Sequence, residues 1–191
     1  MRKKKWNDYL WIATIIYFTL GIFNILFAWL GMACFITPLL FSIVKGNKSY
    51  CNNYCGRSQL LNLLGRKFKL SRNKPTPKFL YSTWFRYGFL AFFMTMFALM
   101  VFNTYQVFAG KPLRESITLL WTFRLPWTWA EVSFVSPWIA QFSFGFFSVM
   151  LTSTILGLIS MILFKPRTWC AFCPMGSMTQ AICKLKAGKD G

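Results

Sequence analysis

The longest uncharged stretch of the chain spans residues 9–44 and limits what the chain can fold into. As one straight helix it would be about 54 Å long, whereas the hydrocarbon core of a bilayer is about 30 Å thick. The stretch therefore predicts two short membrane spans that turn between Gly21 and Gly31, with Asn24 as a candidate turn residue. The alternative is one span to about Leu30 followed by a helix that breaks near Pro38.

Two further apolar blocks predict one membrane span each. We expect an all-α, polytopic membrane protein with about four transmembrane helices in two hairpins, each hairpin followed by a cytoplasmic loop with a cysteine pair and a short helix. The first of these short helices is predicted over 58–64, with Gly65 ending it. The predicted single membrane domain, 1–191, divides into the hydrophobic hairpin 9–44, the basic loop 45–78, the spans 79–107 and 136–164, the interfacial segment 108–135 and the basic tail 165–191.

Charge predicts the topology of the chain. The sequence has 22 Lys and Arg residues against four acidic residues, and the cations are concentrated at the N-terminus, in the loop 45–78 and in the tail 165–191. The positive-inside rule places these segments in the cytoplasm, so we expect a multi-pass protein of the inner cell membrane with both termini cytoplasmic. Because the cations lie between apolar blocks, we expect contact with anionic lipid and no nucleic-acid binding.

The sequence contains no histidine. This excludes His-ligated haem, His-ligated zinc, imidazole acid–base chemistry and nucleophiles activated by histidine. With only four carboxylates, none of them adjacent in sequence, hydrolytic chemistry is poorly supported. Cysteine is the one abundant soft ligand.

Four of the six cysteines form two close pairs, each after an apolar block. Cys51 and Cys55 have the spacing C-x3-C, and Cys170 and Cys173 have the spacing C-x2-C followed by proline. Such spacings let two thiolates of one loop reach the same iron–sulfur cluster. A helix that starts directly after each pair would direct backbone N–H groups at the sulfurs. We predict that these four cysteines, none of them catalytic, bind one cluster, [4Fe–4S] or alternatively [2Fe–2S].

Two other functions use the same cysteines. Four thiolates at these spacings suit a structural zinc ion in a scaffold subunit, and two pairs suit a membrane thiol–disulfide carrier. We expect Cys34 to be a small core residue and Cys183 a spare thiol. Trp169, Phe172 and Tyr54 are predicted to shield the site from water.

The two motifs resemble those of a known family. The segments 50–56 (YCNNYCG) and 169–176 (WCAFCPMG) are similar to the paired C-x3-C-P motifs of the membrane-bound 4Fe–4S polyferredoxin family, which includes NapH- and NosR-type proteins of nitrate and nitrous oxide respiration. Gly56 stands where the family motif has proline, and the second pair is one residue shorter. The resemblance implies iron–sulfur centres at the cytoplasmic face of a membrane module. Because the family's C-terminal ferredoxin-like region is lacking here, we expect one cluster.

The resulting functional prediction is a membrane electron-transfer protein that relays electrons within a larger redox complex. An electron-carrier subunit is favoured over a self-sufficient enzyme. The expected partners are other redox subunits, for which a flavoprotein is one candidate, and an acidic cytoplasmic electron donor such as ferredoxin, which the basic face would attract.

Overall fold

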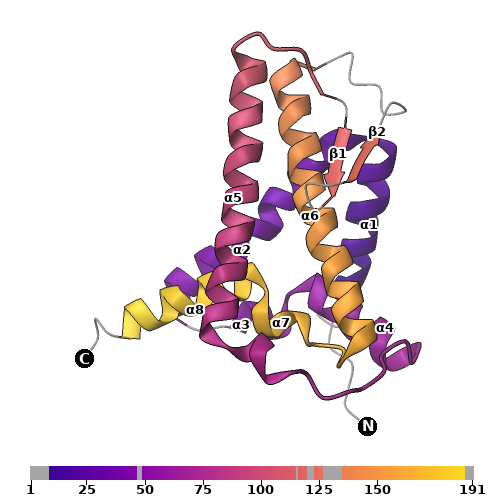
Figure 1. Cartoon of the computed structure of the whole chain (residues 1–191), viewed down its shortest axis with the longest axis vertical. Coiled ribbons are helices and arrows are strands. Elements are labelled where there is room, and N and C mark those ends of the chain that lie inside the picture. The colour runs from indigo at the N-terminus through magenta and orange to yellow at the C-terminus, as the bar shows by residue number, and fades with distance from the viewer. Residues whose placement is uncertain (1–8, 47–48, 115, 120–122, 127–134, 188–191) are drawn as a thin grey trace. The chain divides into compact units, whose positions relative to one another are not determined.

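A computed structural model describes residues 9–46, 49–114, 116–119, 123–126 and 135–187, and the chain is mostly helical. Figure 1 shows the elements in chain order. The helices are α1 Leu10–Phe23, α2 Leu30–Lys45, α3 Ser49–Asn53, α4 Gly56–Lys67, α5 Thr83–Phe108, α6 Pro137–Leu163, α7 Trp169–Phe172 and α8 Pro174–Ala187. Short 3₁₀ turns occupy Ile25–Trp29 and Lys78–Tyr81, and the strands are β1 Ser116–Leu119 and β2 Phe123–Pro126.

The chain forms two compact units. One unit comprises 1–15, 34–91 and 155–191, and the other comprises 16–33 and 92–154. All six cysteines belong to the first unit, which we call the cysteine unit; the second contains both strands, and we call it the hairpin unit.

The first apolar block breaks at Asn24, as the sequence predicted. Asn24 has an extended backbone, and its side-chain oxygen accepts a hydrogen bond from the N–H of Leu26 at 3.0 Å, which caps the following 3₁₀ turn. Pro38 lies inside α2, and that helix continues to Lys45. The 14 residues of α1 would span about 21 Å, less than the bilayer core. The arrangement of this block as a hairpin stays a prediction.

Three helical stretches are long and apolar enough to cross a membrane within the described part of the chain. They are Ile25–Lys45, Thr83–Phe108 and Pro137–Leu163. The last two agree with the predicted blocks 79–107 and 136–164 to within a few residues at each end. The number of helices that cross the membrane stays a prediction.

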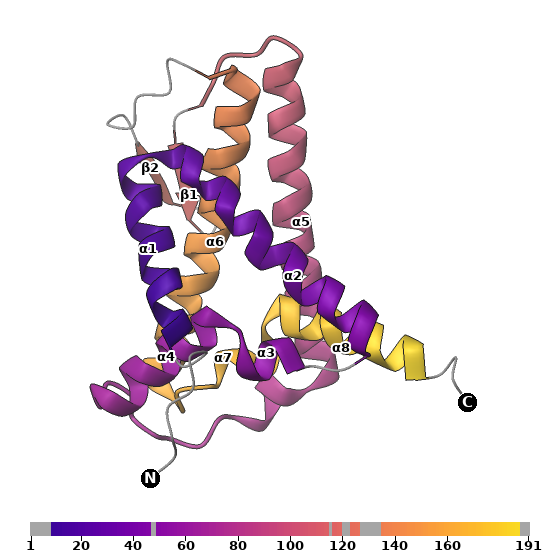
Figure 2. The same cartoon turned by 180° about the vertical axis from the view of Figure 1, so that it is seen from behind.

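The segment 108–135 contains a feature that the sequence analysis missed. Strands β1 and β2 form an antiparallel hairpin that lies beside α6 in both views (Figures 1 and 2). The hydroxyl of Ser148 on α6 donates to the carbonyl of Thr118 on β1. Ile117 is fully buried with Phe144 and Phe147 in the core of the hairpin unit. An all-α fold was therefore wrong for these eight residues.

Helix α4 places the first cysteine pair. Its buried residues Ser58, Leu61 and Gly65 recur at helical spacing and form one face. A Cβ atom on Gly65 would lie 2.8 Å from the Pro166 ring, so this glycine permits close packing of α4 on the segment after α6. The prediction that Gly65 ends the helix was wrong, because α4 continues to Lys67. The close contact with Pro166 explains why glycine is present at this position.

Candidate metal centre

The two cysteine pairs have the same local structure. The first cysteine of each pair lies in a helix of one turn, Cys51 in α3 and Cys170 in α7. The second has an extended backbone, with φ and ψ of −71° and 104° at Cys55 and −52° and 130° at Cys173. A longer helix starts directly after each pair, α4 at Gly56 and α8 at Pro174. The predicted repeat of pair and helix is therefore present.

Helix α4, which follows the first pair, packs on the segment that carries the second pair. Cys170 Sγ lies 3.3 Å from Ser58 Oγ, to which the thiol donates. One turn later, a Cβ atom on Gly157 would lie 3.3 Å from Leu61 and 3.5 Å from Trp169, the residue before Cys170. The buried face of α4, which includes Ser58 and Leu61, therefore packs around the second cysteine pair.

Helix α8, which follows the second pair, packs in turn on the segment that carries the first pair. Cys51 Sγ lies 3.8 Å from Thr179 Oγ1, within hydrogen-bond range for sulfur. At the end of α8, Lys186 Nζ donates to the carbonyls of Ile43 and Val44 at 3.1 and 3.3 Å. A cation at these carbonyls stabilises the C-terminus of α2, a few residues before Cys51. The two halves therefore exchange contacts reciprocally, and the two pairs lie in one region of the cysteine unit.

The thiols of the two pairs interact electrostatically. The pKa of Cys173 is raised to about 11, mainly by burial and in smaller part by negative charge on Cys55 and Cys170. Burial also raises the pKa of Cys170, while its hydrogen bond with Ser58 lowers it. Cys170 is exposed on one side, yet the surrounding protein is enough to desolvate its thiolate. Both thiols are therefore neutral near pH 7 without a metal, and binding to iron, which needs thiolates, would release their protons.

A backbone hydrogen bond and nearby positive charges lower the free-energy cost of forming these buried thiolates. The backbone N–H of Gly176, in the first turn of α8, hydrogen-bonds the sulfur of Cys173 and lowers its pKa. Arg57 lowers the pKa of Cys173 and Arg167 that of Cys170 through their positive charge. The contact from Gly176 matches, at the second pair, the sequence prediction that a following helix directs backbone N–H groups at the sulfurs. At Cys55, no side-chain capping hydrogen bond forms.

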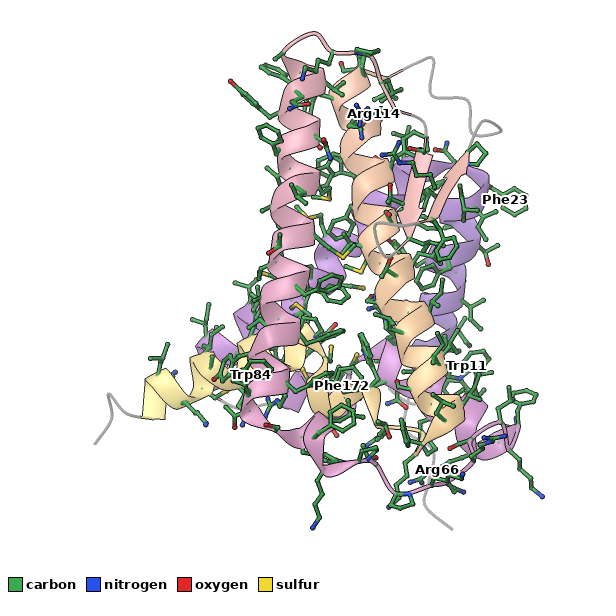
Figure 3. All side chains as sticks on the ribbon, viewed as in Figure 1. Trp11, Phe23, Arg66, Trp84, Arg114 and Phe172 are labelled. Atoms are coloured by element: carbon green, nitrogen blue, oxygen red, sulfur yellow. The ribbon has the colours of Figure 1, made fainter. Side chains whose placement is uncertain are left out.

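Aromatic rings flank each pair. Trp169 and Phe172, with ring centroids 5.1 Å apart, are buried and pack against Phe89 of α5; Figure 3 shows Phe172 at the foot of that helix. Beside the first pair, Tyr50 stacks on Tyr54 at 6.3 Å. Two of the three predicted shielding residues are therefore buried, whereas Tyr54 is exposed.

The glycine at position 56 has a steric reason. A Cβ atom on Gly56 would lie 2.6 Å from the backbone carbonyl of Leu10 and 2.6 Å from Thr14 Oγ1. The first residues of α1 therefore approach the start of α4 more closely than any side chain allows.

Sequence reasoning missed the contacts that connect the cysteine pairs to other helices. Arg86 of α5 donates a hydrogen bond to Gln180 on α8. Cys34, expected in the core, is exposed. Ser58 and Thr179 could have been found as small polar residues one helical turn or two after a cysteine pair, but that signal alone has little specificity.

The residues suit an iron–sulfur cluster in three respects. The four paired thiols belong to one unit, hydroxyl groups lie beside two of them, and the hydroxyl of Ser177 and the indole N–H of Trp169 are buried without a hydrogen-bond partner among the described residues. No three cysteine or carboxylate side chains in that part of the chain are close enough together to hold a single metal ion. A cubane cluster binds each cysteine at a different iron atom, so its ligands need not converge on one point.

Comparison with known proteins identifies the cofactor. The 4Fe–4S binding domain family matches residues 27–75 and 144–189, and each matched segment contains one of the two cysteine pairs. This chain is an iron–sulfur protein. Its cofactor is a [4Fe–4S] cluster, as the sequence predicted, and the match gives no support to the zinc or thiol–disulfide alternatives. No curated protein and no solved structure matches the chain.

Proposed function

We propose that this iron–sulfur protein is a membrane-embedded electron carrier that binds its [4Fe–4S] cluster through Cys51, Cys55, Cys170 and Cys173. One observation carries the assignment: each pair contacts the helix that follows the other pair, through Ser58 for Cys170 and through Thr179 for Cys51. These contacts join sulfur ligands that are more than a hundred residues apart in sequence.

The chemistry that the cluster supplies when bound is one-electron transfer without a bond to the substrate. The residues of the chain set the conditions for it. The Cys170 thiol donates to Ser58, and once that sulfur is a thiolate the hydroxyl would donate to it and stabilise its negative charge. The backbone N–H of Gly176 does the same for Cys173, and the buried rings of Trp169 and Phe172 exclude water. Because donors favour the more negative, reduced form, they raise the reduction potential, whereas burial lowers it.

The distribution of charge supports a topology for the protein in the membrane. We propose that α1 and α2 form a hairpin, that four helices cross the membrane, and that both cysteine pairs and both termini face the cytoplasm, in accord with the basic segments around the cysteines. The resemblance to the NapH- and NosR-type polyferredoxins supports a role as one relay within a larger complex. A flavoprotein subunit and an acidic donor such as ferredoxin are the partners that this chemistry and charge fit.

Replacement of the ligands tests the assignment. Serine at any one of the four paired cysteines is expected to abolish or alter the cluster, because serine supplies a hard oxygen where iron–sulfur clusters take thiolate. The measurements are iron and sulfide content and the EPR spectrum of anaerobically purified protein. Cys34→Ser is the matched control and is expected to keep the full iron content.

Iron content that is unchanged across the four paired cysteines would refute the ligand set. Loss of iron in Cys34→Ser as well, to the same degree, would show that any cysteine substitution unfolds the site. Circular dichroism of each variant distinguishes these outcomes, since a folded variant keeps its helical signal.

A further inference from the structure

The hairpin unit contains a cavity of about 260 Å³ that plays no part in the proposed electron transfer. Its walls come from α5, α6 and the hairpin, all within this one unit. At about 30 Å³ for a water molecule, the cavity has room for about nine waters, more than a single small ion fills. Its size is near the lower end for small-molecule sites.

The register of the hairpin directs polar side chains to the cavity. Thr118 pairs with Arg124, and alternate residues of a strand face opposite sides. Ile117 on one side enters the core of the unit, so Ser116, Thr118 and Arg124 on the other side face the cavity, which they line. The core contact of Ile117 therefore fixes the direction of Arg124.

A second arginine reaches the same cavity from the chain before β1. The backbone N–H of Arg114 donates to Gln141 Oε1 on α6 at 3.0 Å, which holds the start of the hairpin against that helix. Gln141 is 8% exposed and this contact is partly buried, whereas both arginine side chains are exposed. Figure 3 shows Arg114 beside α6. None of the described residues that line the cavity is acidic.

The opposite wall is apolar and is formed by helix packing. A Cβ atom on Gly145 of α6 would lie 2.3 Å from Cγ of Met100, so the absence of a side chain there lets Met100 of α5 lie against α6. Met96, Leu99 and Met100 complete this wall. The α6 residues that line the cavity begin about 6 Å and end about 18 Å from the start of that helix, so the cavity extends well along a candidate membrane span.

We propose that this cavity binds an anionic amphiphile that bears a phosphate group. The guanidinium groups of Arg114 and Arg124, which both line the cavity, would hold the phosphate oxygens, with hydroxyl donors from β1, and the methionine and leucine wall would take the apolar part. Arginine suits this role because its planar fork bonds two phosphate oxygens at once. The shared chemistry is the phosphate group, which an anionic phospholipid or free phosphate could supply. The proposal does not depend on the cluster.

Titration of the purified, cluster-containing protein in detergent micelles with phosphate-bearing probes tests the proposed site. The probes are phosphatidylglycerol, phosphatidylcholine and inorganic phosphate, with bound ligand counted by native mass spectrometry for the lipids and by calorimetry for phosphate. Each of Arg114→Gln and Arg124→Gln is expected to weaken phosphatidylglycerol binding about tenfold. Lys111→Gln removes the same charge from the same loop without lining this cavity, and is expected to leave binding within about twofold.

The probes distinguish the sources. Tight phosphatidylglycerol binding with weak phosphate binding identifies a lipid as the ligand, and equal binding of phosphate alone identifies a free anion; both support the site. The proposal is overturned if neither probe binds, if phosphatidylcholine binds as tightly as phosphatidylglycerol, or if the arginine variants bind like Lys111→Gln.

Discussion

Substitution of Gly65 by alanine tests whether the packing of α4 holds the two cysteine pairs together. The added methyl group would lie 2.8 and 2.9 Å from two carbons of the Pro166 ring and 3.3 Å from Met161. A proline ring on a buried segment has little freedom to move, so α4 itself must shift. Overpacking of this kind costs about 1–3 kcal/mol, and the shift would carry Ser58 away from Cys170.

Gly88→Ala is the matched control, because Gly88 also lies inside a helix and has no heavy atom within 4 Å of its ideal Cβ position. Both substitutions gain about 0.5–1 kcal/mol of helix propensity. That gain cancels in the comparison, so the difference between the two variants is the steric cost alone. At about 2–4 °C per kcal/mol for a chain of this size, Gly65→Ala should lose its cluster at a temperature about 2–12 °C below Gly88→Ala.

The assay is the loss of visible cluster absorbance on anaerobic heating, with helical content followed in parallel. We expect Gly65→Ala to release its cluster before its helices unfold, because the perturbation separates two cysteine pairs without breaking a membrane span. Equal midpoints for the two variants would refute the reasoning, since they would mean that α4 can move without disturbing the centre.

Three further predictions concern the cluster and its cysteines. Ser58→Ala and Thr179→Val each remove a hydroxyl beside a proposed ligand sulfur. In a redox titration each should lower the reduction potential of the cluster by about 20–60 mV, equivalent to about 0.5–1.4 kcal/mol. The control is Thr104→Val, which should leave the potential unchanged because the Thr104 hydroxyl donates to the carbonyl of Met100 in its own helix. Removal of iron should free four additional thiols for alkylation, counted by mass spectrometry, and a gain of two or none contradicts the ligand set. In that iron-free protein, alkylation of Cys173 should accelerate with pH up to about 11, because its pKa is raised from the ordinary 9.0 and only the thiolate reacts.

The sequence predicted the features that depend on local composition. The length of the apolar blocks located α5 and α6, and the short polar side chain of Asn24 located the break in the first block, because an amide that caps a helix is a local signal. The cysteine spacings predicted the type of cofactor, since two thiolates within one short loop suit an iron–sulfur cluster. These inferences need no knowledge of distant contacts.

The missed features all depend on contacts between segments distant in sequence. Gly65 has the same local signal whether it ends a helix or lies against Pro166, and only the packed structure distinguishes these roles. The hairpin also gives a weak local signal, because its two strands have four residues each, too few for a clear alternating pattern. Ile117 is fixed by core residues from other helices, and no local pattern contains that information.

The reciprocal packing implies that neither half of the protein is sufficient for the cofactor. Cys170 needs Ser58 from the first half as its hydroxyl neighbour, and Cys51 needs Thr179 from the second. In the proposed ligand set each half also supplies only two thiolates, whereas a [4Fe–4S] cluster takes four. Stable binding of the cluster therefore requires that α4 and α8 are both in place, so the cluster would stabilise the native packing of the cysteine unit in the same way that a structural metal stabilises a small domain. Cluster loss and loss of the α4–Pro166 contact are then two readouts of one folding event.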